Sequence, residues 1–185
     1  AWAADPQFRH LKKSIKNGPD IHVIYKYKAG DAKNDTAWQR IADAAQIVYP
    51  FIRDHFGAYP NKQYTFIQGG DGGMEYPMAT LINGPSLGTA FHEWMHSWYQ
   101  MMLGTNESLY AWMDEGFTEF ATDMVEHYYR SAMASRSGKN YKDDKLPMYH
   151  SSNYEAYFDL VKSGLEEPLT THADHYNRSE EHTSE

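Results

Sequence analysis

The sequence predicts an α+β fold, with a small β lobe before residue 85 and a helical lobe after it. Three observations predict this fold. Ile21–Lys28 alternates apolar and polar residues, as a half-buried strand does. Thr36–Phe56 changes to the spacing of an amphipathic helix. Leu87–Leu103 is apolar enough for a buried helix, and Gly104 is a typical residue to end it.

The first predicted helix has a clear apolar face and two candidate caps. The residues on that face are Trp38, Ile41, Ala45, Val48 and Ile52. Asp35 or Thr36 is the expected N-cap, and Gly57 is the expected C-cap. Pro50 lies inside the helix, where it is expected to kink the helix or to split it.

Shorter elements complete the prediction. Tyr64–Ile67 and Ala79–Ile82 are short strand candidates, and Ser86 is a plausible N-cap for the buried helix. Two further helices are expected, at about Ala111–Ala134 and at Tyr154–Lys162.

Composition excludes several classes of protein. The chain has 185 residues, of which 41% are hydrophobic, and its formal net charge is −8. A nucleic-acid surface needs clustered Lys and Arg, so no nucleic-acid partner is expected. No apolar run is long enough to span a bilayer. The chain has no Cys, so any metal ligands must be His, Asp or Glu.

The strongest chemical signal is the sequence His92-Glu93-Trp94-Met95-His96 within the buried helix. Positions i and i+4 lie about 40° apart around a helix and about 6 Å along it. Two imidazoles at these positions can bind one zinc ion from the same helix face. Glu93 follows the first ligand, so its carboxylate can act as the general base that takes a proton from metal-activated water.

Catalytic zinc usually has three protein ligands and keeps the fourth position open. Glu115 is the predicted third ligand, because it lies on the next expected helix with eighteen residues between it and His96. An antiparallel pair of helices would bring Glu115 back beside the two histidines. The sequence therefore predicts one Zn²⁺ ion as the cofactor.

These residues resemble a known family. The H-E-x-x-H pattern, followed after eighteen residues by Glu115, is similar to that of the gluzincin aminopeptidases, the aminopeptidase N family. Upstream, Gly72-Gly73-Met74-Glu75-Tyr76 resembles the G-x-M-E-N motif of that family. The resemblance extends from about Ile21 to His127. Tyr76 stands where the family usually has Asn, and Asp114 stands where Asn usually precedes the third ligand.

The resemblance implies a zinc-dependent aminopeptidase with a thermolysin-like catalytic domain, whose site lies in a cleft between the lobes. Peptide or protein N-termini are the implied substrates. Glu75 would bind the free α-ammonium of the substrate, and the backbone of Gly73 and Met74 would pair with the peptide. The resemblance implies a tail of a preceding β domain (1–28) and a partial catalytic domain (29–177). Residues 178–185 are expected to be a non-native tail on separate grounds, given below. An extracytoplasmic location, periplasmic or secreted, is favoured.

The sequence leaves several alternative interpretations open. His92 and His96 could be core histidines, and Glu75 could be an ordinary loop carboxylate. Glu119 lies one turn beyond Glu115, where it could hydrogen-bond a ligand histidine or simply face solvent. The protein could also be a zinc endopeptidase of the same clan, or a non-catalytic homologue that serves as a binding module.

The two ends of the sequence suggest an incomplete and inactive gene product. The chain does not begin with Met. The family places a transition-state-stabilising Tyr in a Y-x-K-G-like motif, which is absent here, so that Tyr is expected beyond the chain end. Arg178–Glu185 resembles the in-frame translation of a common sequencing-library adapter and is expected to have no structural role; an ordinary polar C-terminus is the alternative.

Overall fold

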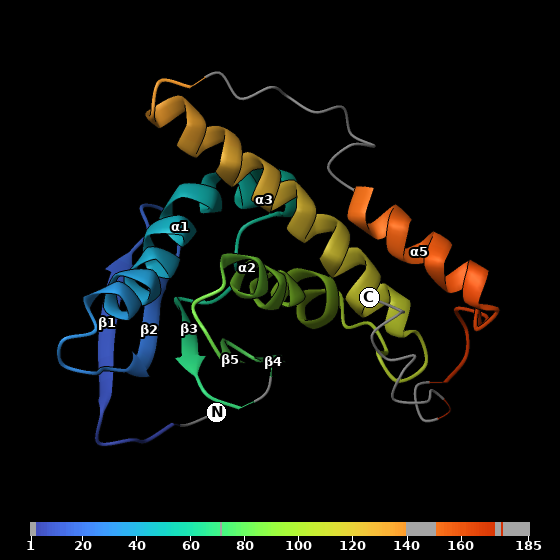
Figure 1. Ribbon diagram of the computed structural model, residues 1–185, viewed down its shortest axis with the longest axis horizontal. Coiled ribbons are helices and arrows are strands. Elements are labelled where there is room, and N and C mark those ends of the chain that lie inside the picture. The colour runs from blue at the N-terminus through green and yellow to red at the C-terminus, as the bar shows by residue number, and fades with distance from the viewer. Residues whose placement is uncertain (1–2, 71, 140–150, 173–174, 176–185) are drawn as a thin grey trace. The chain divides into compact units, whose positions relative to one another are not determined.

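A computed structural model describes residues 3–70, 72–139, 151–172 and 175. The chain forms two compact units, Ala1–Ser97 and Trp98–Glu185, which we call the N-terminal and C-terminal units (Figure 1). The octapeptide at residues 178–185 lies outside the described residues.

The N-terminal unit is built on a five-stranded mixed sheet with the order β1-β2-β3-β5-β4. The strands β2, β3 and β5 are parallel, whereas β1 pairs with β2 and β4 pairs with β5 in antiparallel fashion. Both edge strands therefore have a single strand neighbour in the described sheet. The strands are β1 (Phe8–Ser14), β2 (Asp20–Lys26), β3 (Gln63–Gln68), β4 (Gly73–Tyr76) and β5 (Ala79–Ile82).

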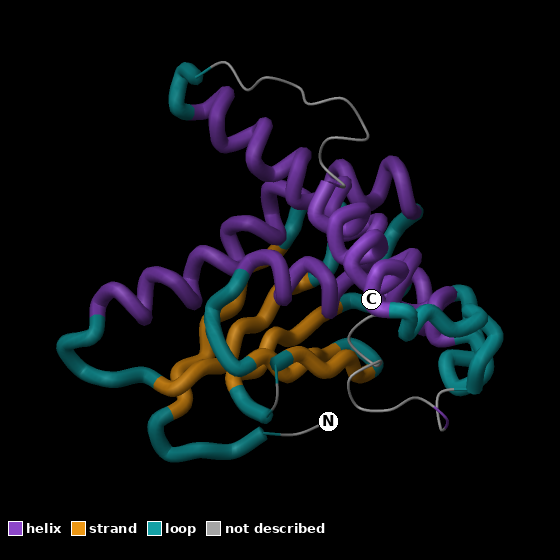
Figure 2. Tube along the Cα trace, turned by 45° about the vertical axis from the view of Figure 1, so that its right-hand side comes forward, coloured by secondary structure: helices purple, strands orange, loops and turns teal. Residues whose placement is uncertain are grey.

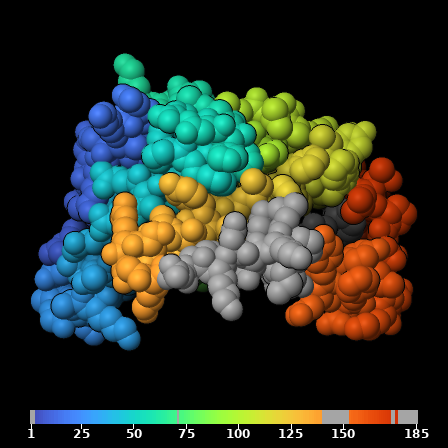
Figure 3. All heavy atoms as spheres, turned by 90° about the horizontal axis from the view of Figure 1, so that it is seen from above, coloured from blue at the N-terminus to red at the C-terminus, as the bar shows by residue number. Residues whose placement is uncertain are grey.

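Two helices of this unit pack against the sheet. Helix α1 (Ala32–Phe56) connects β2 to β3 and lies against β1 and β2, and α2 (Leu87–His96) lies against β4 and β5 (Figure 2). The space-filling view shows the atoms of α1 packed on the blue atoms of the first strands (Figure 3). The predicted apolar face of α1 is buried, from Trp38 to Ile52. Burial of these side chains and of alternate residues on β2 and β3 supplies the core.

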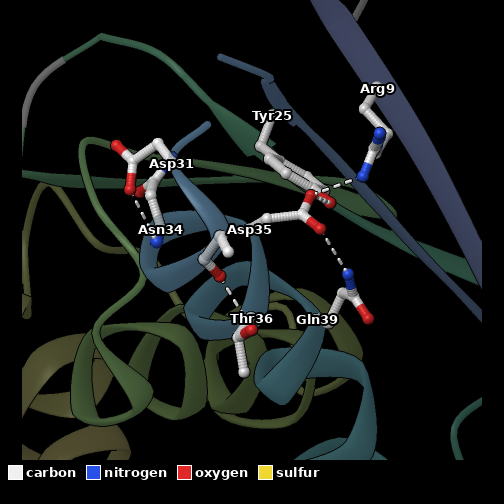
Figure 4. A network of polar contacts seen from close by, with 8 residues as sticks. Arg9, Tyr25, Asp31, Asn34, Asp35, Thr36 and Gln39 are labelled. Carbon is white, nitrogen blue, oxygen red and sulfur yellow. Dashed lines mark hydrogen bonds and ion pairs between the residues drawn. The ribbon is translucent and has the colours of Figure 1, made fainter. Parts of the chain in front are cut away.

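Helix α1 begins earlier than the sequence indicated. Asp31 is the N-cap, and its side chain accepts a hydrogen bond from the backbone N–H of Asn34 at 3.1 Å. Asp35, one of the two expected caps, instead accepts hydrogen bonds from Tyr25, Arg9 and Gln39 at 2.6, 2.6 and 2.8 Å (Figure 4). Its carboxylate thus joins β1, β2 and α1.

Pro50 does not split α1, which is one continuous helix of 25 residues. A proline inside a helix removes one backbone hydrogen bond and costs about 3 kcal/mol. Val48, Tyr49 and Ile52 on both sides of Pro50 are almost completely buried. Packing of their side chains, about 1.5–3 kcal/mol each, outweighs that cost and keeps the helix continuous.

The elements that the structure describes in the C-terminal unit are helices, joined by turns. A π-helical segment, η1 (Ser97–Met102), follows directly after α2, so the expected helix Leu87–Leu103 changes its winding part-way. The remaining elements are the π-helical segment η2 (Trp112–Gly116) and the helices α3 (Phe117–Arg136) and α5 (Ser151–Ser163). Asn153 on α5 donates a hydrogen bond to Asp123 on α3 at 3.0 Å, which connects these two helices.

The mixed class predicted from the sequence is confirmed: all described strands end before residue 85, and the described elements after it are helices. The strands within residues 1–28 hydrogen-bond into the same sheet as β3. The division into domains stays a prediction. None of the helices in the described ranges is long and apolar enough to cross a membrane.

Candidate metal centre

Helix α2 places His92 and His96 side by side. Ser86 caps the helix through a hydrogen bond from the backbone N–H of Thr89 at 3.3 Å, which satisfies one of the free donors of its first turn. The Nε2 atoms of the two histidines lie 3.1 Å apart, and their rings meet edge to face. His96 is almost fully buried, and His92 is half-buried.

This spacing fits a zinc ion. Two nitrogens bound to a tetrahedral zinc at 2.0–2.1 Å lie about 3.3–3.4 Å apart, close to the observed separation. Neutral imidazole binds zinc through one ring nitrogen, and the two Nε2 atoms that lie close together are the atoms that could do so. The donor set is His and carboxylate only, which suits zinc in a chain without Cys.

Glu93 is directed toward the sheet. It is 6% exposed, and its Oε2 atom lies 3.3 Å from the hydroxyl of Thr80 on β5. Its other oxygen, Oε1, lies against the backbone of Gly73 on β4, where an added Cβ would be 2.0 Å from it. The main-chain carbonyl of Glu93 accepts a hydrogen bond from the Tyr64 hydroxyl at 3.0 Å. Both ends of this residue are therefore held by the sheet.

Strand β4 carries the residues of the upstream motif at the edge of the sheet. Gly73 and Glu75 are half-buried and alternate with the exposed Met74 and Tyr76. Glu75 pairs in register with Thr80 on β5, so these two side chains lie on the same sheet face. Because Gly73 is two residues from Glu75, it lies on that face too. The N-terminal unit thus brings Gly73, Glu75 and Glu93 to one sheet face.

Tyr64 lies beneath this group. Its side chain is fully buried, and burial raises the pKa of its hydroxyl well above the ordinary value of 10.0. The nearby Tyr59 and the carboxylates of Glu93 and Glu75 raise that pKa further. The hydroxyl therefore stays protonated at neutral pH, which lets it remain a hydrogen-bond donor to the backbone of α2.

The remaining predicted residues belong to the C-terminal unit. Glu115 lies on η2 and is half-buried, and its neighbour Asp114 is 4% exposed. Glu119 lies in the first turn of α3 and is also half-buried. Short π-helical segments often occur at functional sites, because their wider winding shifts the direction of side chains. The roles of Glu115 and Glu119 stay predictions.

Sequence reasoning missed Thr80 and Tyr64. Each is a common strand residue, and neither stands inside the H-E-x-x-H pattern or the Gly-rich motif. Thr80 could have been identified only from the register between β4 and β5, which places it opposite Glu75. That register depends on the turn at Pro77 and Met78, where Met78 has a φ of 66°.

Comparisons with known proteins give a likeness at the level of the fold. No model of a known protein family matches the chain, and neither does any curated protein. The structure is similar to an M1 zinc metallopeptidase from Deinococcus radiodurans, with a TM-score of 0.55 and 19% identity over 89% of this chain and 35% of that chain. A point mutant of an M1 zinc metallopeptidase from the same organism, bound to a Tyr-Ser-Ala substrate, has a TM-score of 0.54, 18% identity and the same coverage.

A third structure is that of a two-domain M1 zinc metallopeptidase mutant bound to L-tryptophan. It has a TM-score of 0.51 and 17% identity, over 89% of this chain and 34% of that one. The chain therefore spans about a third of the length of the structures that it matches. The fold is shared with zinc metallopeptidases.

Proposed function

We propose that this chain carries the catalytic zinc site of a metallopeptidase of the M1 family, and that the protein removes residues from the N-termini of peptides. The observation that carries the proposal is the pair of Nε2 atoms of His92 and His96, 3.1 Å apart. The buried carboxylate of Glu93 lies on the same helix, in a fold shared with M1 zinc metallopeptidases.

In this proposal, Glu115 completes the set of zinc ligands. The support for Glu115 is its spacing in the sequence, with eighteen residues between it and His96. Two imidazoles and one carboxylate are a known ligand set of catalytic zinc, and they leave one position open. Glu119, four residues beyond Glu115, is proposed to orient a ligand through a hydrogen bond.

A bound zinc ion would polarise the peptide carbonyl and make a nearby water molecule more acidic. Glu93 takes the proton from the water as its oxygen bonds to the carbonyl carbon. The same carboxyl then returns the proton to the amine that leaves when the C–N bond breaks. Its burial excludes bulk water, so the carboxylate keeps a fixed position for both transfers.

Glu75 and the edge strand β4 are proposed to bind the substrate. β4 has β5 as its one strand neighbour in the described sheet, so a peptide can extend the sheet along the backbone of Gly73 and Met74. The half-buried carboxylate of Glu75 pairs with the α-ammonium group of that peptide. Fixing the N-terminus restricts cleavage to the first peptide bond.

The test uses the full-length, zinc-loaded protein that carries this sequence. We expect it to hydrolyse aminoacyl-arylamides with a free amine and to leave their acetylated counterparts intact. Glu93→Gln should keep the zinc content and lose most of the activity, because an amide cannot take the proton. Equal rates on both substrates would point to an endopeptidase, and normal turnover by Glu93→Gln would remove Glu93 as the base.

A further inference from the structure

We infer that Thr80 is a positioning residue for Glu93. Its hydroxyl and the bare backbone of Gly73 form a seat, the Gly73–Thr80 seat, that fixes the Glu93 carboxylate against the sheet. This inference rests on the proposed function, since it assigns Thr80 a role through the proposed general base. It adds a residue that lies outside both the metal ligands and the upstream motif.

The hydroxyl of Thr80 has two neighbours inside the protein. Thr80 is fully buried, and its Oγ1 atom lies 2.9 Å from the main-chain carbonyl of Met74 and 3.3 Å from Oε2 of Glu93. A buried hydroxyl without a partner costs about 1–3 kcal/mol, and valine has the same shape and a high strand propensity. Val would fill the same space at this position, but it would make neither the contact with the Met74 carbonyl nor the one with the Glu93 carboxylate.

The carbonyl of Met74 fixes where the hydroxyl oxygen lies. A hydroxyl has one proton to donate and two lone pairs to accept with. Thr80 can donate that proton to the carboxylate of Glu93 or to the carbonyl of Met74, and in both cases Oγ1 stays between the two groups. The Glu93 carboxylate accepts a hydrogen bond when the hydroxyl turns its proton toward Oε2, and the Met74 carbonyl accepts it in the other orientation.

Gly73 supplies the second side of the seat. A Cβ at this position would lie 2.0 Å from Oε1 and 2.8 Å from Cδ of Glu93. Gly73 is not among the glycines with positive φ in the described structure, so its backbone conformation is open to any residue. Glycine is needed there for space, because any side chain would occupy the position of the carboxylate.

The seat matters for the chemistry because a general base has to lie within hydrogen-bonding reach, about 2.6–3.2 Å, of the proton that it takes. A misplacement of about 1 Å can lower the rate about 100-fold. Tyr64 already fixes the main chain of Glu93, so the position of the carboxylate depends on its side-chain torsions. The Gly73–Thr80 seat limits these torsions through contacts with both carboxylate oxygens.

The test compares Thr80→Val with Thr80→Ser in the full-length, zinc-loaded protein. We expect Thr80→Val to lower kcat about 10- to 100-fold while KM changes by less than about threefold. The zinc content should stay unchanged. Thr80→Ser keeps the hydroxyl and should restore most of kcat, which a role in packing alone would not produce. If the valine protein does not fold, Thr80→Ala takes its place with the same criteria.

A matched control is Thr122→Val on α3. Thr122 is also buried, and its hydroxyl donates to the carbonyl of Thr118 at 2.8 Å. This control should keep the wild-type kcat. A wild-type kcat in Thr80→Val, equal losses in Thr80→Val and Thr80→Ser, or an equal loss in the control would overturn the inference.

Glu93→Gln, measured in parallel, distinguishes a failure of the inference about Thr80 from a failure of the proposed function. If Glu93→Gln is inactive and Thr80→Val turns over normally, the inference fails and the proposed function stands. If Glu93→Gln turns over normally, the proposed base and its seat both fail. Crystal structures of Thr80→Val and Thr80→Ser give a readout besides activity: the carboxylate should move in the former and stay in place in the latter.

Discussion

Replacement of Gly73 by Ala tests the geometry around Glu93 with a single methyl group. The new Cβ would lie 2.0 Å from Oε1 of Glu93, whereas real Cβ atoms essentially never come within 3.0 Å of another heavy atom. The carboxylate must therefore move by at least about 1 Å. A displacement of this size lowers kcat about 100-fold, which corresponds to about 2.7 kcal/mol in activation free energy.

The stability of the Gly73→Ala protein should change little, so its loss of kcat would not result from partial unfolding. The atom that the methyl group meets is at the end of a flexible side chain, which can turn away. An alanine also loses less backbone freedom on folding than a glycine does. We expect the free energy of unfolding to change by no more than about 1 kcal/mol.

The assay measures kcat on a free-amine arylamide, the zinc content and the thermal unfolding of the full-length protein. Gly72→Ala is the matched control, because a Cβ at Gly72 has no described heavy atom within 4 Å beyond its chain neighbours. This neighbouring variant should keep its kcat within about threefold of the wild type. A wild-type kcat in Gly73→Ala, or equal losses in the two variants, would refute the reasoning.

Three further predictions concern the substrate, the pH dependence and the packing. Glu75→Ala should slow cleavage of free-amine substrates far more than it lowers the zinc content, because it removes the partner of the α-ammonium group. The Tyr25 hydrogen bond, and the positive charge nearby, hold the pKa of Asp35 below its ordinary value of 3.8. The stability that this carboxylate contributes is therefore present above about pH 4 and lost as the pH falls through its folded pKa. Thermal unfolding from pH 7 to pH 2.5 should show this loss, and Asp35→Asn should reduce it. Gly18→Ala should destabilise the fold by about 1–3 kcal/mol, because its Cβ would lie 2.4 Å from the Tyr49 ring.

Each of these predictions has an outcome that would contradict it. A Glu75→Ala protein that cleaves free-amine substrates at the wild-type rate would remove the role of Glu75. An Asp35→Asn protein with the same acid unfolding as the wild type would show that this carboxylate does not drive the pH effect. Gly84→Ala is the control for Gly18→Ala, since among the described residues a Cβ at Gly84 has no heavy atom within 4 Å beyond its chain neighbours. Equal chemical denaturation midpoints for the two variants would rule out the close contact with Tyr49.

Local sequence rules were enough for several parts of the fold. The spacing of four residues placed His92 and His96 on one helix face, and the structure brings their Nε2 atoms together. The Ser86 cap was predicted from residue type, and its hydrogen bond is present. These features depend on neighbours within one helical turn, so a short stretch of chain contains the information that determines them.

The sequence analysis did not predict strand β1, because its composition is not typical of a strand. Phe8–Ser14 contains Arg9, Lys12 and Lys13, which are uncommon in a buried strand. The strand lies at an edge of the sheet, and charged residues are usual there because they discourage pairing with other chains. The position within the sheet, and not the local pattern, explains its sequence.

The sequence by itself determined the chemical groups: two histidines and a glutamate in one helix, a Gly-rich motif upstream, and no Cys. The tertiary structure decided what surrounds the Glu93 carboxylate. Thr80 and Gly73 reach it through the register of β4 on β5 and the packing of α2 against both strands. Register depends on which strands pair and which face is buried, and these are properties of the whole sheet. A single sequence therefore names Glu93 as the proposed base, whereas only the assembled sheet shows what surrounds its carboxylate.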